Sequence, residues 1–109
     1  MEELIKMMLA FREERNWGQF HNPKDLAISL SLEASELLEN FQWKSSEETV
    51  ATKRQELADE LADVLIYAFF LAEALDLNVE DIIRSKMKKN AAKYPVDKSF
   101  GKMTKYNEL

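Results

Sequence analysis

The chain has 109 residues, of which 46% are hydrophobic and 32% are charged, and its formal net charge is −5. This length predicts one domain, and the absence of cysteine excludes disulfides and thiolate metal sites. The acidic balance argues against a nucleic-acid polymer as partner, and the sequence predicts no membrane role and no signal peptide, so a cytoplasmic protein is expected.

Helices are predicted throughout, because only two glycines and two prolines interrupt the chain and no useful apolar alternation, typical of strands, is present. Apolar residues at helical spacing predict a first helix over residues 2–16, which Gly18 ends. Pro23, with its fixed φ angle, suits the first turn of a second helix over 23–42, with Asn22 as its cap.

The second half of the chain predicts two more helices. Ser45 and Glu48 have the spacing of a capping box, which predicts the start of a long helix over 46–75. Asn78 is expected to cap a fourth helix over 78–93, which Pro95 ends, and residues 95–109 are predicted to form an extended or mobile tail. The predicted fold class is therefore all-α, a four-helix bundle in one domain over 1–109.

Two pairs of carboxylates lie in the predicted second and third helices: Glu33 with Glu36, and Glu60 with Asp63. A spacing of three residues puts each pair on one face of its helix. Asp63 is the lone charge in an apolar run over 61–72, and a buried carboxylate without a partner costs several kcal/mol. A divalent cation shared by the four carboxylates is therefore predicted, and hard oxygen ligands favour Mg²⁺ or Mn²⁺.

Other side chains leave two interpretations open. His21 is either a packed or exposed loop histidine or a substrate ligand. Trp43 and Tyr67 either belong to the core or stack on a nucleobase. Lys86 and Asn90, one helical turn apart, either donate to phosphates or take part in a salt network at the end of the helix.

Charge is unevenly distributed along the chain. Residues 32–63 hold nine acids and three bases, whereas residues 84–109 hold eight bases and two acids. An acidic metal site and a basic segment would suit a small polyphosphate, but charge alone favours the alternative that the basic run is a solvated helix face and tail.

The two carboxylate pairs also carry a resemblance. Glu33-x-x-Glu36 followed by Glu60-x-x-Asp63 resembles the signature of the all-α, MazG-like nucleoside triphosphate pyrophosphohydrolases. Six further segments resemble the dCTP pyrophosphatase branch over nearly the full length: REERNWGQFH at 12–21, FQWKS at 41–45, DVLIY at 63–67, SKM at 85–87, KYP at 93–95 and KYNEL at 105–109.

This resemblance implies a MazG-like homo-oligomer, a tetramer or at least a tight dimer. It also implies a catalytic Mg²⁺ held by Glu33, Glu36, Glu60 and Asp63. The substrate contacts that it implies are Trp17, Gly18, Gln19, Phe20, His21, Trp43, Tyr67, Lys86 and Asn90. The chain departs from the family pattern at Leu32, where an acidic residue is usual, and at Met8, where dCTP-preferring relatives carry a histidine that contacts substrate.

The predicted function is Mg²⁺-dependent hydrolysis of a deoxynucleoside triphosphate, dCTP or a 5-modified dCTP, to the monophosphate and pyrophosphate. A glutamate, Glu36 or Glu39, is expected to orient or deprotonate the attacking water. The alternative is a non-catalytic helical oligomerisation module, in which the carboxylates form salt networks with Lys53, Arg54 and the basic fourth helix. Only the first hypothesis predicts that Mg²⁺ raises the melting temperature.

Overall fold

The computed structural model describes residues 1–108, so Leu109, the last residue of the predicted tail, lies outside the described residues. The described part of the chain is helical without any strand, which confirms the predicted all-α class. It divides into two compact units, Met1–Asp76 and Leu77–Leu109. Within residues 1–108, no helix combines the length and the hydropathy needed to cross a membrane.

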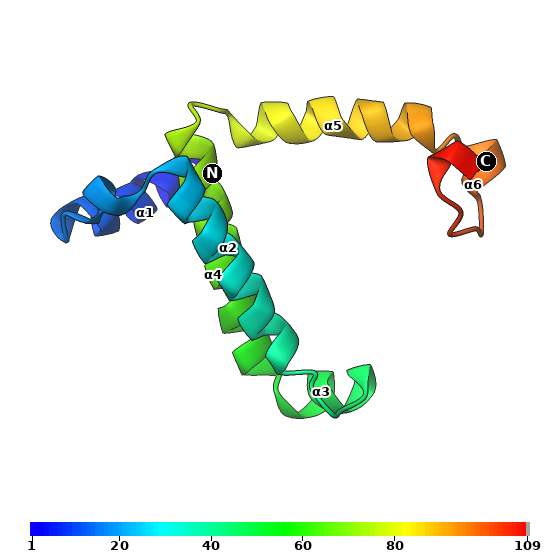
Figure 1. The fold of residues 1–109 in the computed structure, drawn as a ribbon, viewed down its shortest axis with the longest axis horizontal. Coiled ribbons are helices and arrows are strands. Elements are labelled where there is room, and N and C mark those ends of the chain that lie inside the picture. Colours follow the sequence, from blue (N-terminus) through cyan, green and yellow to red (C-terminus); the bar gives the residue numbers. More distant parts are fainter. Residues whose placement is uncertain (109) are drawn as a thin grey trace. The chain divides into compact units, whose positions relative to one another are not determined.

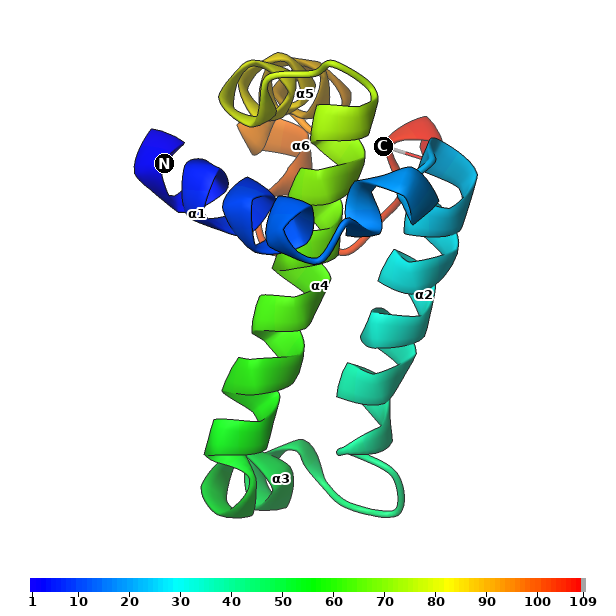
Figure 2. The ribbon, with the colours of Figure 1, turned by 90° about the vertical axis from the view of Figure 1, so that its left-hand side faces the viewer.

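A helical hairpin forms the centre of the first unit. The elements of this unit are α1 (Glu2–Glu14), the 3-10 helix η1 (Trp17–Phe20), α2 (Pro23–Glu39), α3 (Ser46–Thr52) and α4 (Arg54–Ala74). Helices α2 and α4 run side by side in opposite directions (Figures 1 and 2). Helix α1 and η1 lie at one end of this hairpin, and the short helix α3 lies at the other.

Side-chain caps begin two of these helices, as the sequence predicts. Asn22 Oδ1 accepts a hydrogen bond of 2.9 Å from the backbone N–H of Asp25, and Pro23 occupies the first turn of α2. Ser45 Oγ accepts a 3.1 Å bond from the N–H of Glu48 at the start of α3. Each bond satisfies an N–H group that has no partner inside its helix.

The ends of the predicted helices need correction. Helix α1 stops at Glu14, and the chain reverses at Asn16, whose φ is 54°, whereas Gly18 lies inside η1. Helix α2 stops at Glu39 rather than at residue 42. The long helix predicted over 46–75 is two helices, because Lys53, with φ −126° and ψ 30°, departs from helical geometry between them.

The core of the first unit is small. Met8 of α1, Leu26 of α2 and Phe70 of α4 form its buried cluster, so the core lies where these three helices meet. Around it pack the partly buried side chains of Leu9, Ile66, Tyr67, Phe69, Leu71 and Ala74. The hairpin therefore meets α1 through this compact apolar cluster.

The second unit contains α5 (Val79–Lys93), α6 (Val96–Ser99) and the 3-10 helix η2 (Tyr106–Glu108). Asn78 caps α5 as predicted, since its Oδ1 accepts from the N–H of Asp81 at 3.0 Å. The rings of Tyr94 and Tyr106 lie 6.1 Å apart, so the described tail folds back on the end of α5. Of the two predicted alternatives, an extended or a mobile tail, the extended one was wrong, because residues 96–99 and 106–108 are helical and aromatic packing of this kind escapes an analysis of periodicity. The described residues therefore hold six α-helices and two 3-10 helices rather than four helices.

Candidate active site

Three of the four predicted carboxylates meet between the two helices of the hairpin. Glu33 and Glu36 project from α2 and Glu60 from α4, and one carboxylate oxygen of each lies within 4.8 Å of the others. The i, i+3 spacing in α2 puts Glu33 and Glu36 on one face, and the antiparallel pairing of α2 with α4 brings Glu60 to that face. A cluster of this composition suits a hard cation.

The cluster has an excess of negative charge. Burial, and then the adjacent carboxyl group of Glu36 through hydrogen bonding and charge, raise the pKa of Glu33 to about 7, with further contributions from the charges of Asp63 and Glu60. Burial, and then the charges of Glu36 and Asp63, raise the pKa of Glu60 as well. No ion pair within residues 1–108 involves any of these four acids. Within the described part of the first unit, none of the four acids therefore forms an ion pair with Lys53 or Arg54.

Two oxygens in the cluster lack a hydrogen-bond partner among the described residues. They are Oε2 of Glu33 and Oε2 of Glu60, and both are buried. A buried carboxylate oxygen without a donor is costly, and a divalent cation would remove that cost. The donor set and its unsatisfied atoms therefore fit a metal ion with a preference for oxygen ligands.

Asp63 differs from the sequence-based expectation. It is exposed, although it was predicted to be buried in an apolar helix. The reason is that α4 leaves much of its apolar surface uncovered, with Leu61 and Leu65 each 49% exposed. Asp63 still lies beside the cluster, because its charge contributes to the raised pKa of Glu33 and the two residues line one cavity.

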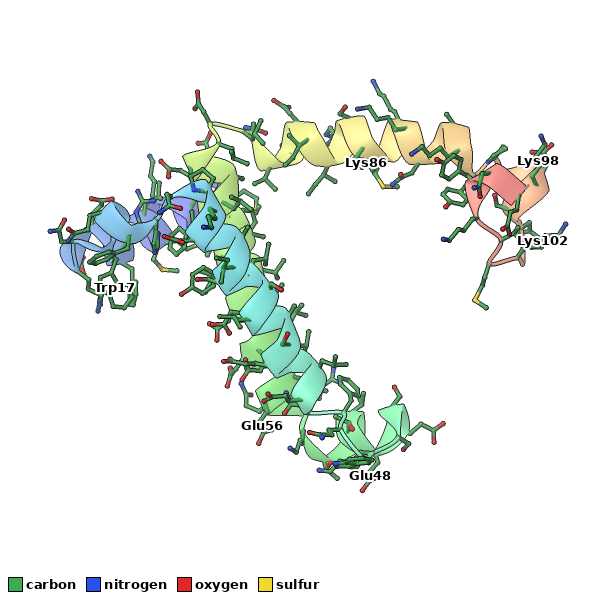
Figure 3. All side chains as sticks on the ribbon, in the orientation of Figure 1. Trp17, Glu48, Glu56, Lys86, Lys98 and Lys102 are labelled. Carbon is green, nitrogen blue, oxygen red and sulfur yellow. The ribbon has the colours of Figure 1, made fainter. Side chains whose placement is uncertain are left out.

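This cavity joins the carboxylates to an aromatic wall. It has a volume of about 400 Å³ and an apolar lining interrupted by Glu33, Asp63 and His21. The remaining lining residues are Met7, Met8, Phe11, Trp17, Ile66, Tyr67 and Phe70. Figure 3 shows Trp17 near the end of the hairpin where η1 lies. A planar apolar group and an attached polyanion with its cation would suit such a lining.

A second cavity of about 420 Å³ shares part of this wall. Trp17, His21 and Tyr67 line both cavities, whereas Phe20, Asp25, Leu26 and Ser29 line only the second. Asp25 and Ser29 of α2 are one helical turn apart, and Glu33 follows after another turn. Polar side chains therefore follow one face of α2 from the second cavity to the carboxylates.

His21 is packed against two aromatic rings. Its ring centroid lies 5.0 Å from that of Phe70 and 6.5 Å from that of Tyr67. Burial, and then the positive charge of Arg12, lower the pKa of His21, so the imidazole is neutral at pH 7. Its Nδ1 is buried and has no hydrogen-bond partner within residues 1–108, which leaves it available to a bound molecule.

Other predicted site residues lie outside these cavities. Gly18 and Gln19 are part of η1, where Gln19 Nε2 donates to the backbone oxygen of Asn16 at 2.9 Å. Trp43, which is 95% exposed, follows α2 at the end where α3 begins, and neither cavity includes it. Figure 3 shows this separation, since Trp17 and the α3 residue Glu48 are at opposite ends of the first unit. Two further predicted residues, Lys86 and Asn90, belong to α5 of the second unit.

Sequence reasoning missed several lining residues. Phe11 and Phe70 stand at helical spacing among other apolar residues, and periodicity does not distinguish a cavity wall from a core. Asp25 and Ser29 could have been predicted from helical periodicity, because positions 25, 29, 33 and 36 share one helical face.

The raised pKa of Glu33 predicts an unusual pH dependence in the metal-free protein. Between pH 4.5 and about 7 the folded chain holds a proton on Glu33 that the unfolded chain has released. The contribution of Glu33 to the free energy of unfolding is fully present below this window. It is lost as the pH rises through the window, because the folded state binds more protons there than the unfolded state. Melting temperatures in EDTA should therefore fall from about pH 5 to about pH 7.5, and fall less in Glu33→Gln, which does not ionise. Equal declines in both proteins would contradict this assignment.

The chain resembles known pyrophosphatases in both sequence and fold. Residues 28–109 match the model of the MazG-like family. Over 114 aligned positions the chain is 39% identical to dCTP pyrophosphatase 1 of Mus musculus and 36% identical to that of Homo sapiens, covering 100% of this chain and 67% of each relative. A pyrophosphatase of Archaeoglobus fulgidus has a similar fold, with a TM-score of 0.83 and 44% identity over 87% of this chain and 92% of that one.

All-helical architecture and an acidic cluster beside an aromatic cavity agree with these similarities. The chain belongs to the MazG-like family, in the branch that contains the dCTP pyrophosphatases. It is accordingly an enzyme, a nucleoside triphosphate pyrophosphohydrolase.

Proposed function

We propose that this enzyme hydrolyses dCTP or a 5-modified dCTP to the nucleoside monophosphate and pyrophosphate. The observation that supports this best is the cavity in which Glu33 and Asp63 lie beside Trp17 and Tyr67. A nucleotide needs both surfaces, since its base packs on rings and its phosphates need a cation. The similar enzymes of known name are dCTP pyrophosphatases, which favours this substrate. In this proposal residues 1–109 act as one pyrophosphohydrolase domain.

The proposed cofactor is Mg²⁺, with Mn²⁺ as a substitute. Glu33, Glu36 and Glu60 would hold it together with the neighbouring Asp63, and the unsatisfied oxygens of Glu33 and Glu60 support this assignment. When bound, Mg²⁺ supplies charge neutralisation at the triphosphate and Lewis acidity at the reacting centre.

The protein's own residues position the substrate and the water. Glu36 is the exposed member of the cluster, and it or Glu39, about one turn further along α2, would accept the proton of the attacking water. The rings of Trp17, Phe20 and Tyr67 would enclose the base and sugar. Neutral His21, with its free Nδ1, would hydrogen-bond the nucleoside.

The base preference of the enzyme is proposed to depend on residues particular to this chain. Met8 is 8% exposed and lines the cavity, and its thioether makes only weak hydrogen bonds. Selection among bases would therefore depend on His21 and on the polar residues of the second cavity, Asp25 and Ser29. Lys86 and Asn90 are proposed to contact phosphates, and Trp43 is proposed as a further substrate contact.

A hydrolysis screen tests the proposal. Pyrophosphate and monophosphate release should be measured with Mg²⁺ for the eight common nucleoside and deoxynucleoside triphosphates and for 5-methyl-dCTP. The highest kcat/KM is expected for dCTP or its 5-methyl derivative, with no release in EDTA. Higher activity on a purine triphosphate would refute the substrate assignment, and full activity in EDTA would refute the metal assignment.

We also propose that the enzyme is a homo-oligomer, with a tetramer as the expected state. The first unit exposes apolar pairs one helical turn apart, Ile28 and Leu32 on α2 and Leu61 and Leu65 on α4, each between 48% and 60% exposed. Buried hydrophobic side chains in this unit are few, so much of its apolar surface needs a partner.

Light scattering at micromolar concentration should therefore give a mass near four chains. Leu61→Lys with Leu65→Lys should lower this mass and the melting temperature together, because two buried charges in an interface are costly. Val96→Lys, on the 78% exposed side chain at the start of α6, is the matched control. A monomeric wild-type protein would contradict the proposed assembly.

A further inference from the structure

One ion pair ties the first helix to the last turn of α4. Arg12 Nη1 lies 3.0 Å from Glu73 Oε2, and the two residues are 61 positions apart in the sequence. Figure 2 shows α1 crossing α4 toward the C-terminal end of α4, where Glu73 lies. Among residues 1–108 this is the only ion pair that joins two different helices, since the others link neighbours along the chain or one turn of one helix.

Arg12 is held more firmly than a typical surface arginine. Its side chain is only 12% exposed, and its Nε also donates to Glu13 Oε1 at 3.0 Å. Its guanidinium carbon lies 5.7 Å from the ring centroid of Phe70, within the range of a cation–π contact. An arginine held by two carboxylates and a ring loses little further freedom, so its pair with Glu73 has more value than an exposed pair would.

Both residues of the ion pair are close in sequence to residues that line the cavity containing Glu33 and Asp63. Phe11 precedes Arg12 in α1, and Met7 and Met8 lie one turn earlier, and all three line the cavity. On the α4 side, Phe70 also lines the cavity, and it lies one turn before Glu73. The spacing between α1 and α4 therefore sets the width of this part of the cavity.

We propose that Arg12 and Glu73 are positioning residues for nucleotide binding, which hold α1 against α4 so that Met7, Met8 and Phe11 form a fixed wall for the base. The inference rests on the proposed function, because it requires that this cavity takes the base. It assigns no chemical step to the ion pair, since neither residue lines the cavity with Glu33 and Asp63. Loss of the pair should therefore weaken binding and leave the chemical step almost unchanged.

Steady-state kinetics with dCTP and Mg²⁺ test this split. Arg12→Met and Glu73→Met should each raise KM by about 5-fold or more with kcat within about 2-fold, as expected for a lost interaction that contributes to binding alone. The KM of the double variant should be no higher than that of the single variant with the higher KM, because both changes break the same interaction. Arg12→Lys, which keeps the charge, should recover most of the affinity.

Arg84→Met is the matched control. It breaks the exposed Arg84–Glu80 pair of α5, whose nitrogen and oxygen are also 3.0 Å apart, and it should leave KM unchanged. An unchanged KM in both single variants, with or without a lower melting temperature, would show that the Arg12–Glu73 pair is only structural. A kcat that falls as much as KM rises would also overturn the proposal. If Trp17→Ala leaves KM unchanged as well, the cavity itself is misassigned and the proposed function fails with it.

Discussion

Turnover of dCTP is expected to fall by at least roughly 100-fold in Glu60→Gln and in Asp63→Asn, with the helical fold retained. Each change deletes one negative charge from the proposed metal site with almost no change in volume. Even outer residues of metal sites typically contribute about 10- to 100-fold, so a direct ligand should contribute more. Pyrophosphate release measures turnover, and circular dichroism with a melting curve measures the fold.

The melting curves carry a second expectation. Removing one carboxylate relieves the repulsion that raises the pKa values of Glu33 and Glu60, so the metal-free variants should be as stable as wild type or more stable. Mg²⁺ should raise the melting temperature of wild type by mass action and raise that of the variants less. If a variant loses activity, keeps its metal-free melting temperature and responds less to Mg²⁺, the loss comes from the metal site and not from misfolding.

Glu56→Gln is the matched control for these two variants. Glu56 lies on the same helix, one turn before Glu60, and is exposed (Figure 3). It belongs neither to the carboxylate cluster nor to the cavity that contains Glu33 and Asp63. Its variant should keep wild-type turnover and the full response to Mg²⁺. If Glu60→Gln or Asp63→Asn behaves like Glu56→Gln, that residue has no place in the metal site.

Local chemistry predicted the starts of the helices well and their ends poorly. Asn22, Ser45 and Asn78 each accept the capping hydrogen bond that their spacing predicts, because a cap depends on three or four consecutive residues. The break at Lys53 has no such signal, since neither glycine nor proline marks it. Such a break depends on how α3 packs against α4, which is tertiary information.

The same distinction applies to the candidate site. Helical periodicity is enough to predict that Glu33 and Glu36 share a face, and the structure adds that Glu60 meets them across the hairpin. Periodicity does not say which aromatic residues come near this cluster. Trp17 lines both cavities and Trp43 lines neither, although both tryptophans are partly or fully exposed and both lie in connections between helices.

This difference between the tryptophans predicts a difference in binding. KM for dCTP should rise by about 5- to 150-fold in Trp17→Ala, since stacking of a base on an aromatic ring contributes roughly 1–3 kcal/mol. Trp17→Phe keeps a ring and should raise KM less. Trp43→Ala should raise KM less than Trp17→Ala does, because its side chain is 95% exposed and the residue belongs to the connection between α2 and α3, whereas Trp17 belongs to η1 at the other end of α2.

In all three tryptophan variants kcat should fall less than it does in Glu60→Gln, because a stacking ring binds the base in the ground state and the transition state alike. Steady-state kinetics over a range of dCTP concentrations, with light scattering on each variant, separate this effect from a loss of assembly. A larger rise in KM for Trp43→Ala than for Trp17→Ala, in an intact oligomer, would contradict the assignment of the base to the cavity beside Tyr67. The base would then be bound at the α3 end of the hairpin, and Trp17 would serve only to pack η1 against Phe11, whose ring centroid lies 5.8 Å from its own.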